Sequence, residues 1–158
     1  MTNQLQSELL KAANSTFERL GFVLPDEQLQ EWQESASLDY RTRVSFSGPV
    51  RGELVIRISE DVASEMAANM LGLFDGADGS VIEDALGEIA NVICGNLVPA
   101  LGRPEDVFDL GAPETTLDPS QENEPSAAPI ARVDVGLDEG RAELLLFVED
   151  QKRHGEAA

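Results

Sequence analysis

Two runs of alternating side chains, separated by three turn-forming residues, place the strongest constraint on the fold of this chain. The alternation has a period of two, which is typical of a β-strand with one buried face. In residues 38–46 the mainly apolar side is Leu38, Tyr40, Thr42, Val44 and Phe46, and the polar side is Asp39, Arg41, Arg43 and Ser45. In residues 50–58 the inward side is Val50, Gly52, Leu54, Ile56 and Ile58. The link Ser47-Gly48-Pro49 is a turn, so the two runs predict an antiparallel hairpin.

Two further segments show the three- and four-residue spacing of apolar residues that indicates an amphipathic helix. In residues 3–21 these are Leu5, Leu9, Ala13, Phe17 and Leu20, and the helix is expected to end near Gly21. After the hairpin the spaced residues are Val62, Met66, Met70 and Phe74. Ser59 is the predicted N-cap of this second helix, with Glu60 and Asp61 in its first turn. Residues 75–79 are interpreted as a turn and not as a calcium loop, because the terminal glutamate of such a loop is absent.

A third helix is predicted from residue 80 to about Val98. Ser80 and Glu83 have the spacing of a capping box, in which each side chain satisfies a backbone group of the first helical turn. Pro99 ends the helix because it lacks a backbone N–H and its ring crowds the preceding turn. The third helix is therefore bounded by sequence signals at both ends.

Two segments lack a regular pattern. Residues 22–37 contain Pro25 and are expected to be irregular or partly helical, anchored by Leu29 and Trp32. Residues 111–129 are rich in Pro, Ser, Thr and Glu and cannot bury enough apolar surface to offset the entropy of ordering. We therefore expect a mobile acidic loop there, over residues 112–129 in particular.

A second hairpin is predicted near the C-terminal end of the chain. Its strands are residues 133–137 and 144–148, joined by a turn at residues 138–140. Residues 150–158 are expected to be a disordered tail. With 158 residues, 42% of them apolar, the chain is predicted to form one α+β domain over residues 1–158. A mostly antiparallel sheet would form one layer, and the long helices, packed on one face of it, the other.

The charge of the chain argues against two classes of partner. It has 11 basic and 30 acidic residues, and the formal net charge of -19 repels phosphate backbones and anionic lipid headgroups. We therefore expect no binding to nucleic acid or to membranes. The chain shows no signal-peptide pattern and no run of 18 apolar residues, and its single cysteine, Cys94, cannot form an internal disulfide. These features predict a soluble cytoplasmic protein.

The residue inventory also excludes several reaction types. His154 is the only histidine and lies in the C-terminal tail, so a Ser-His-Asp or Cys-His arrangement is not expected. No GxxxxGKS, GxxxxGKT or GxGxxG motif is present to bind a nucleotide, and no cluster of cysteine or histidine predicts a metal site. Any chemistry is expected to use carboxylates, amides and hydroxyls, without a cofactor of its own.

The third predicted helix has a polar stripe, by which we mean Asp84, Glu88, Asn91 and Gly95. At 100° per residue these positions fall within about 60° of one another. The opposite side of the helix is apolar and consists of Ile82, Leu86, Ile89, Ile93 and Leu97. Cys94 borders the stripe and is interpreted as an inert small residue, because no base lies beside it. Asn96 leans toward the apolar side, where we expect it to hydrogen-bond the backbone.

Two side chains of the polar stripe suit complementary tasks. The carboxylate of Glu88 can pair with an ammonium group of a partner, and the amide of Asn91 can hold a water molecule through its donor and its acceptor. Orienting a water toward an acyl phosphate accelerates hydrolysis without an acid or a base. The short side chains of the stripe also let another backbone approach closely. The alternative is that the stripe is an ordinary solvated helix face.

The chain resembles the CheC/CheX/FliY family of response-regulator phosphatases, and most closely its CheX branch. The resemblance runs through FSGPVRGELVIRISEDVASEMAANMLG (residues 46–72) and DALGEIANVICGNLVPALG (residues 84–102). The family signature is Asp or Ser, three residues, Glu, two residues, Asn, and a later proline. On this chain the signature falls on Asp84, Glu88, Asn91 and Pro113.

The resemblance implies hydrolysis of the aspartyl phosphate of a CheY-like receiver domain. Glu88 would form a salt bridge with the active-site lysine of the receiver, and Asn91 would orient the attacking water. Asp84, Gly95 and Pro113 would support the site or contact the partner, and Mg²⁺ would be supplied by the phosphorylated receiver. The net charge of -19 would oppose docking on the acidic face of a receiver, so recognition is expected to depend on local contacts.

The resemblance also implies a homodimer and two pseudo-symmetric halves that share one sheet. The first predicted helix has Lys11 and Asn14 where a second signature would have Glu and Asn, so we expect one active helix per chain. Two alternatives remain open. One is a receiver-binding or signalling adaptor of the same fold without turnover, and the other is a structural domain whose polar stripe is only solvated.

Overall fold

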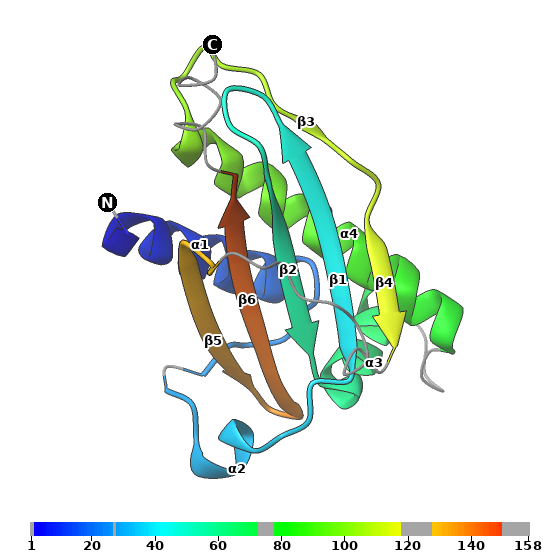
Figure 1. Cartoon of the computed structure of the whole chain (residues 1–158). Helices are drawn as coiled ribbons and strands as arrows, with labels where there is room; N and C mark the ends of the chain where they lie inside the picture. The colour runs from blue at the N-terminus through cyan, green and yellow to red at the C-terminus, as the bar shows by residue number, and fades with distance from the viewer. Residues whose placement is uncertain (1, 27, 73–77, 118–127, 150–158) are drawn as a thin grey trace.

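A computed structural model describes residues 2–26, 28–72, 78–117 and 128–149. Its elements are α1 (Thr2–Arg19), α2 (Glu31–Glu34), β1 (Tyr40–Ser47), β2 (Gly52–Ile58), α3 (Glu60–Leu71), α4 (Gly79–Leu97), the 3-10 helix η1 (Val98–Leu101), β3 (Asp109–Leu110), β4 (Glu114–Leu117), β5 (Ala131–Leu137) and β6 (Gly140–Val148). The strands form one antiparallel sheet with the order β3-β1-β2-β6-β5, and β4 also pairs with β1. Figure 1 shows the two long helices, α1 and α4, behind this sheet on the same face. The predicted α+β architecture is confirmed, while its pseudosymmetry stays a prediction.

Both predicted hairpins are present and together form the centre of the sheet. β1 pairs with β2 in a register that places Val44 opposite Leu54. β5 pairs with β6, with Val133 opposite Leu144. The hairpins join through β2 and β6, where Ile56 lies opposite Leu144. Apolar residues of all four strands therefore meet on one face of the sheet.

The main core lies between this face and the helices. Buried residues of α1 include Leu9, Ala13 and Phe17, and those of α4 include Leu86, Ile89 and Ile93, each at most 2% exposed. The predicted apolar sides of both helices therefore contribute to the core. A smaller cluster on the opposite face of the sheet consists of Val55, Leu145 and Phe147.

Arg41 departs from the predicted half-buried strand, because its relative exposure is only 2%. It lies in β1 between Thr116 of β4 and Arg57 of β2. Strand β4, which was not predicted, makes β1 an interior strand of the sheet. Arg43, two residues along, stays partly exposed and pairs with Glu53 at 2.9 Å.

The start of α4 differs from the predicted capping box. The helix begins at Gly79, and its N-cap is Asp78, whose carboxylate accepts the Val81 backbone N–H at 3.0 Å. Ser80 donates its hydroxyl to the same carboxylate at 2.9 Å, so the predicted box of Ser80 and Glu83 is wrong. An ionised carboxylate is the stronger acceptor for the free N–H groups of a first turn. These two hydrogen bonds hold the pKa of Asp78 below its ordinary value.

Ser59 occupies the N-cap position of α3 as predicted, but its hydroxyl does not cap the helix. It donates to the carbonyl oxygen of Ser37 at 2.7 Å, and the backbone N–H of Glu60 donates instead to the carboxylate of Asp39 at 2.8 Å. Asp39, a residue outside the helix, therefore satisfies one of the free N–H groups in the first turn of α3.

Helix α3 also ends earlier than predicted. Its last residue is Leu71, and Gly72 follows with a φ of 67°, a left-handed conformation that stops a helix and that glycine adopts without strain. The predicted helix continued to Phe74. That residue and residues 75–77 of the predicted turn lie outside the described residues, and the turn's last two residues, Asp78 and Gly79, are the N-cap and the first residue of α4.

The connection at residues 22–37 contains one short helix, α2, in agreement with the irregular or partly helical segment predicted. Trp32 is the wrong anchor, because it is 50% exposed, whereas the neighbouring Gln33 is 1% exposed. The Gln33 amide donates to the Asp26 carboxylate and to the Leu137 carbonyl oxygen, both at 2.8 Å. A polar residue is buried here because its hydrogen bonds are made within the protein.

The mobile loop predicted at residues 111–129 is wrong over its first part. Glu114–Leu117 forms β4, which pairs with β1 so that Thr115 lies opposite Thr42. Threonine fits a pleated surface, and the edge of β1 offers unpaired backbone groups to such a segment. Residues 118–127 and the predicted tail at residues 150–158 lie outside the described residues.

Candidate functional site

Helix α4 positions the polar stripe because the two sides of the helix have different surroundings. The apolar side is at most 3% exposed and consists of Ile82, Leu86, Ile89, Ile93 and Leu97. On the other side Asp84, Glu88 and Gly95 are exposed and Asn91 is half-buried. The predicted helical geometry of the polar stripe is therefore confirmed.

A groove lies between α4 and the segment that leads into β4. Its volume is about 280 Å³, and its lining residues are Glu83, Asp84, Gly87, Glu88, Asn91, Pro113 and Thr115. The groove brings Asp84, Glu88 and Asn91 together with Pro113, a residue far away in the sequence. Gly95 is not part of this lining and lies one helical turn beyond Asn91.

Gly87 is a groove residue that the sequence analysis missed. It is buried on the flank of the polar stripe, and a Cβ atom at this position would lie 3.0 Å from Cγ of Pro113. A glycine inside an amphipathic helix lowers helix stability, so it often marks a packing requirement. That general signal was present in the sequence, although nothing local pointed to Pro113 as the neighbour.

Thr115 is the second lining residue that the sequence analysis missed. Its hydroxyl lies 2.9 Å from the hydroxyl of Thr42, which is 1% exposed. The hydrogen bond between these hydroxyls fixes β4 to β1 on the side that faces α4. Pro113 and Thr115 therefore form a wall of the groove that is attached to the sheet, and we call these two residues the β4 wall.

The groove is acidic. Three of its lining side chains are carboxylic acids, Glu83, Asp84 and Glu88, and none of its lining residues is basic. Carboxylates gathered beside one groove attract a cationic group of a partner, and the attraction strengthens as docking removes water. Asn91 and Thr115 add neutral donors and acceptors. The arrangement can therefore pair with an ammonium group and hold a water molecule beside it.

Two residues beside the polar stripe test the finer predictions. Cys94 is fully buried, and burial raises the pKa of its thiol to about 12, so the thiol stays neutral and the prediction of an inert residue is confirmed.

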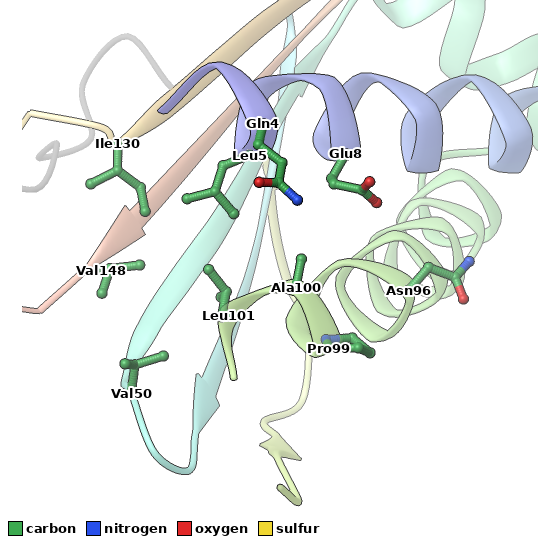
Figure 2. A pocket seen from close by; sticks show the side chains of 10 residues that line it. All are labelled: Gln4, Leu5, Glu8, Val50, Asn96, Pro99, Ala100, Leu101, Ile130 and Val148. Carbon is green, nitrogen blue, oxygen red and sulfur yellow. The ribbon is translucent and has the colours of Figure 1, made fainter. Parts of the chain in front are cut away.

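Asn96 is exposed, so the prediction that it leans toward the core is wrong. Figure 2 shows it beside a second pocket, between α1 and η1. Near its C-terminal end, α4 faces this pocket with the side that carries Asn96.

The described ranges hold neither a cluster of metal-ligating side chains nor a membrane-spanning helix. No group of three or more His, Cys, Asp or Glu residues there is placed to hold a metal ion. None of the helices found there has the length and apolar character needed to cross a bilayer.

Several solved structures share this fold. The CheX chain from Borrelia burgdorferi is 20% identical, with a TM-score of 0.69, over 91% of this chain and 97% of that one. CheX from Vibrio vulnificus is 19% identical, with a TM-score of 0.71, over 94% and 99% of the two chains. CheX from Desulfovibrio desulfuricans is 17% identical, with a TM-score of 0.71, over 92% and 99%. These similarities establish the fold.

The family assignment comes from the sequence. Among curated protein sequences, none matches this chain. The family model described as chemotaxis phosphatase CheX matches residues 40–133, which is more than half of the 158 residues and includes the polar stripe and Pro113. This chain belongs to the CheX family of chemotaxis phosphatases.

Proposed function

We propose that this chain is a phosphatase that hydrolyses the aspartyl phosphate of a CheY-like receiver domain. The observation that carries the proposal is the acidic groove, which collects Glu88 and Asn91 on one open face beside Pro113. Membership of the CheX family supports the activity. The similar CheX protein from Borrelia burgdorferi forms a complex with CheY, BeF3 and Mg²⁺, which supports the class of partner and the origin of the metal.

In the proposed reaction a water molecule attacks the phosphorus atom of the aspartyl phosphate. The bond between phosphorus and the aspartate oxygen breaks, and the products are inorganic phosphate and the free carboxylate of the receiver. The Asn91 amide orients the water, because it offers a donor and an acceptor at one place. Mg²⁺ belongs to the receiver, where it neutralises charge on the phosphoryl oxygens.

Docking depends on the carboxylates of the groove. Glu88 pairs with an ammonium group of the receiver, and Asp84 lies one helical turn earlier on the same rim. At Gly95 a Cβ atom would meet no heavy atom within 4 Å, so the partner backbone has room at the next turn. Because the whole chain has a net charge of -19, these local contacts must outweigh unfavourable long-range charge repulsion from an acidic receiver.

A receiver-binding adaptor without turnover is the second candidate. The lining of the groove favours the adaptor, because three carboxylates are available for docking and only one amide, that of Asn91, is available for the reaction. Homodimer formation and a cytoplasmic location remain predictions from the family resemblance and from the composition.

The test is the lifetime of a Mg²⁺-loaded, phosphorylated receiver in the presence of wild-type protein, Asn91→Ala and Glu88→Ala. Loss of one positioning group should slow dephosphorylation by on the order of 10²-fold. Asn96→Ala and Glu18→Ala are the matched controls, because both side chains are exposed and lie outside the groove. Both controls should keep wild-type activity.

The outcomes separate the candidates. An unchanged phosphate lifetime with wild-type protein across several receivers would exclude the phosphatase, and binding without turnover would then favour the adaptor. Full activity of Asn91→Ala would exclude water positioning by this residue. A loss in Glu88→Ala that higher receiver concentration restores would assign Glu88 to docking.

A further inference from the structure

The three glycines of α4 differ in their surroundings. A Cβ atom at Gly79 or Gly95 would have no neighbour within 4 Å, whereas one at Gly87 would lie 3.0 Å from Cγ and 3.5 Å from Cβ of Pro113. Positive φ does not explain Gly87, because the only positive-φ glycine among the described residues is Gly72. Gly87 is therefore required for the close approach of another segment.

That segment is held on both sides of Pro113. Before it, the backbone N–H of Gly111 donates to the carbonyl oxygen of Ser45 at 2.8 Å. After it, β4 pairs with β1, and the Thr115 hydroxyl bonds to that of Thr42 at 2.9 Å. The β4 wall therefore cannot move away from α4 without breaking contacts with β1.

Helix α4 is equally constrained on its other side. Leu86 and Ile89, the neighbours of Gly87 and Glu88 in the sequence, are 2% and 1% exposed in the core. A side chain added at position 87 would therefore strain the contact between two fixed bodies, the sheet-bound β4 wall and the packed helix. The strain would act beside Glu88 and Asn91, which share the groove with Pro113.

We propose that Gly87 is a positioning residue, which sets the separation between the β4 wall and the side chains of Glu88 and Asn91. This inference rests on the proposed phosphatase function. A groove of about 280 Å³ admits a side chain or a short loop of the receiver, and its width decides how that element lies when Asn91 orients the water. The absence of a side chain at Gly87 thereby contributes to the geometry of the reaction.

The test is a double-mutant cycle with Gly87→Ala, Pro113→Ala and the two combined. Gly87→Ala is expected to slow receiver dephosphorylation by about tenfold, since small misplacements of positioning groups have large effects on rate. Pro113→Ala removes the Cγ atom at 3.0 Å and leaves the Cβ contact at 3.5 Å, which is ordinary van der Waals contact. Pro113→Ala alone is not expected to exceed the wild-type rate, so additive effects would leave the combined variant at least as slow as Gly87→Ala. A combined variant that is faster than Gly87→Ala is the expected result and shows coupling between the two positions.

Gly79→Ala is the matched control, because it is the same substitution on the same helix with open space around it. It should change the rate less than about twofold. Circular dichroism and the thermal midpoint of each variant report whether the fold is retained. If Gly87→Ala does not fold, Thr115→Val and Thr115→Ser replace it. Thr115→Val loses the hydrogen bond to Thr42 and should dephosphorylate the receiver more slowly than wild type. Thr115→Ser keeps a hydroxyl and should have the wild-type rate.

Three results would overturn the inference. The first is wild-type activity of Gly87→Ala. The second is a combined variant whose slowing equals the product of the slowing in Gly87→Ala and in Pro113→Ala. The third, if Gly87→Ala does not fold, is an equal rate for Thr115→Val and Thr115→Ser. Failure of the proposed function looks different, because wild-type protein would then be inactive. If wild-type protein binds the phosphorylated receiver without turnover, the affinity of each variant for that receiver is measured in place of the rate. Coupling between Gly87→Ala and Pro113→Ala then supports the role of Gly87, and additive effects overturn it.

Discussion

The two long helices of this protein are alike on the inside and different on the outside. Both α1 and α4 lie on the same face of the sheet (Figure 1) and bury apolar residues against it. Both carry an asparagine three residues after a charged residue, as Lys11 and Asn14 on α1 and as Glu88 and Asn91 on α4. Both inward sides consist of apolar side chains packed in the core, so the inward sides do not distinguish the two helices.

The outward sides differ in their neighbours. The flank of α4 faces the β4 wall, which encloses Glu88 and Asn91 in a groove. On α1 the Oδ1 atom of Asn14 is buried and has no hydrogen-bond partner within the described part of the chain, while Lys11 is exposed. The two helices therefore differ both in the charged residue of this pattern and in the neighbours of their outward sides.

The largest expected effect concerns the shared inward side. Phe17→Ala on α1 and Ile89→Ala on α4 remove buried side chains that are 0% and 1% exposed. Each should lower the free energy of unfolding by roughly 2–5 kcal/mol, measured by urea denaturation, because each leaves a cavity. Lys11→Ala and Asp84→Ala are exposed controls and should change it by less than about 0.5 kcal/mol. If only one helix showed the large loss, the two inward sides would not be equivalent.

The next effect concerns the outward sides. Glu88→Lys makes α4 resemble α1 and should slow dephosphorylation of the receiver by about 10²-fold, equivalent to about 2.7 kcal/mol, because lysine would repel an ammonium group in the groove. Lys11→Glu makes α1 resemble α4 and should give no gain in rate, because α1 has no β4 wall. The combined variant should be as slow as Glu88→Lys alone. Activity in the combined variant would show that the wall is dispensable.

The smallest effect concerns the start of α4. The Asp78 carboxylate accepts from Val81 and Ser80, and these bonds hold its pKa below the ordinary value of 3.8. Because folding favours the ionised form, the contribution is present above the unfolded pKa and is lost as the pH falls through the folded value. Asp78→Ala should therefore lower the thermal midpoint slightly at pH 7, and the difference should shrink in the acidic range below 3.8. A difference independent of pH would contradict the carboxylate cap.

Strands β1 and β4 show how far the fold can be predicted from the sequence. The alternation of Tyr40, Thr42, Val44 and Phe46 identifies β1 from its own residues. Strand β4 has four residues, and its partner β1 lies far away in the sequence, so no local pattern separates Glu114–Leu117 from a polar loop.

The candidate site divides in a similar way. The shared face of Glu88 and Asn91 follows from helical periodicity alone, whereas Pro113 was reached only through the family resemblance. Gly87 carries the general signal of a glycine inside a helix. Thr115 carries none, because its position depends on the pairing with Thr42 across the sheet. Local periodicity thus predicts one side of the groove, and long-range pairing determines the other.

Strands β3 and β4 also affect how this protein behaves toward other unfolded or folding chains. They cover the outer edge of β1 with pieces of two and four residues, and the interruption between them contains Pro113, which has no N–H to donate to a neighbouring strand. A short and broken edge is a poor template for strand addition. The segment that borders the groove therefore also protects this side of the sheet against edge-to-edge aggregation.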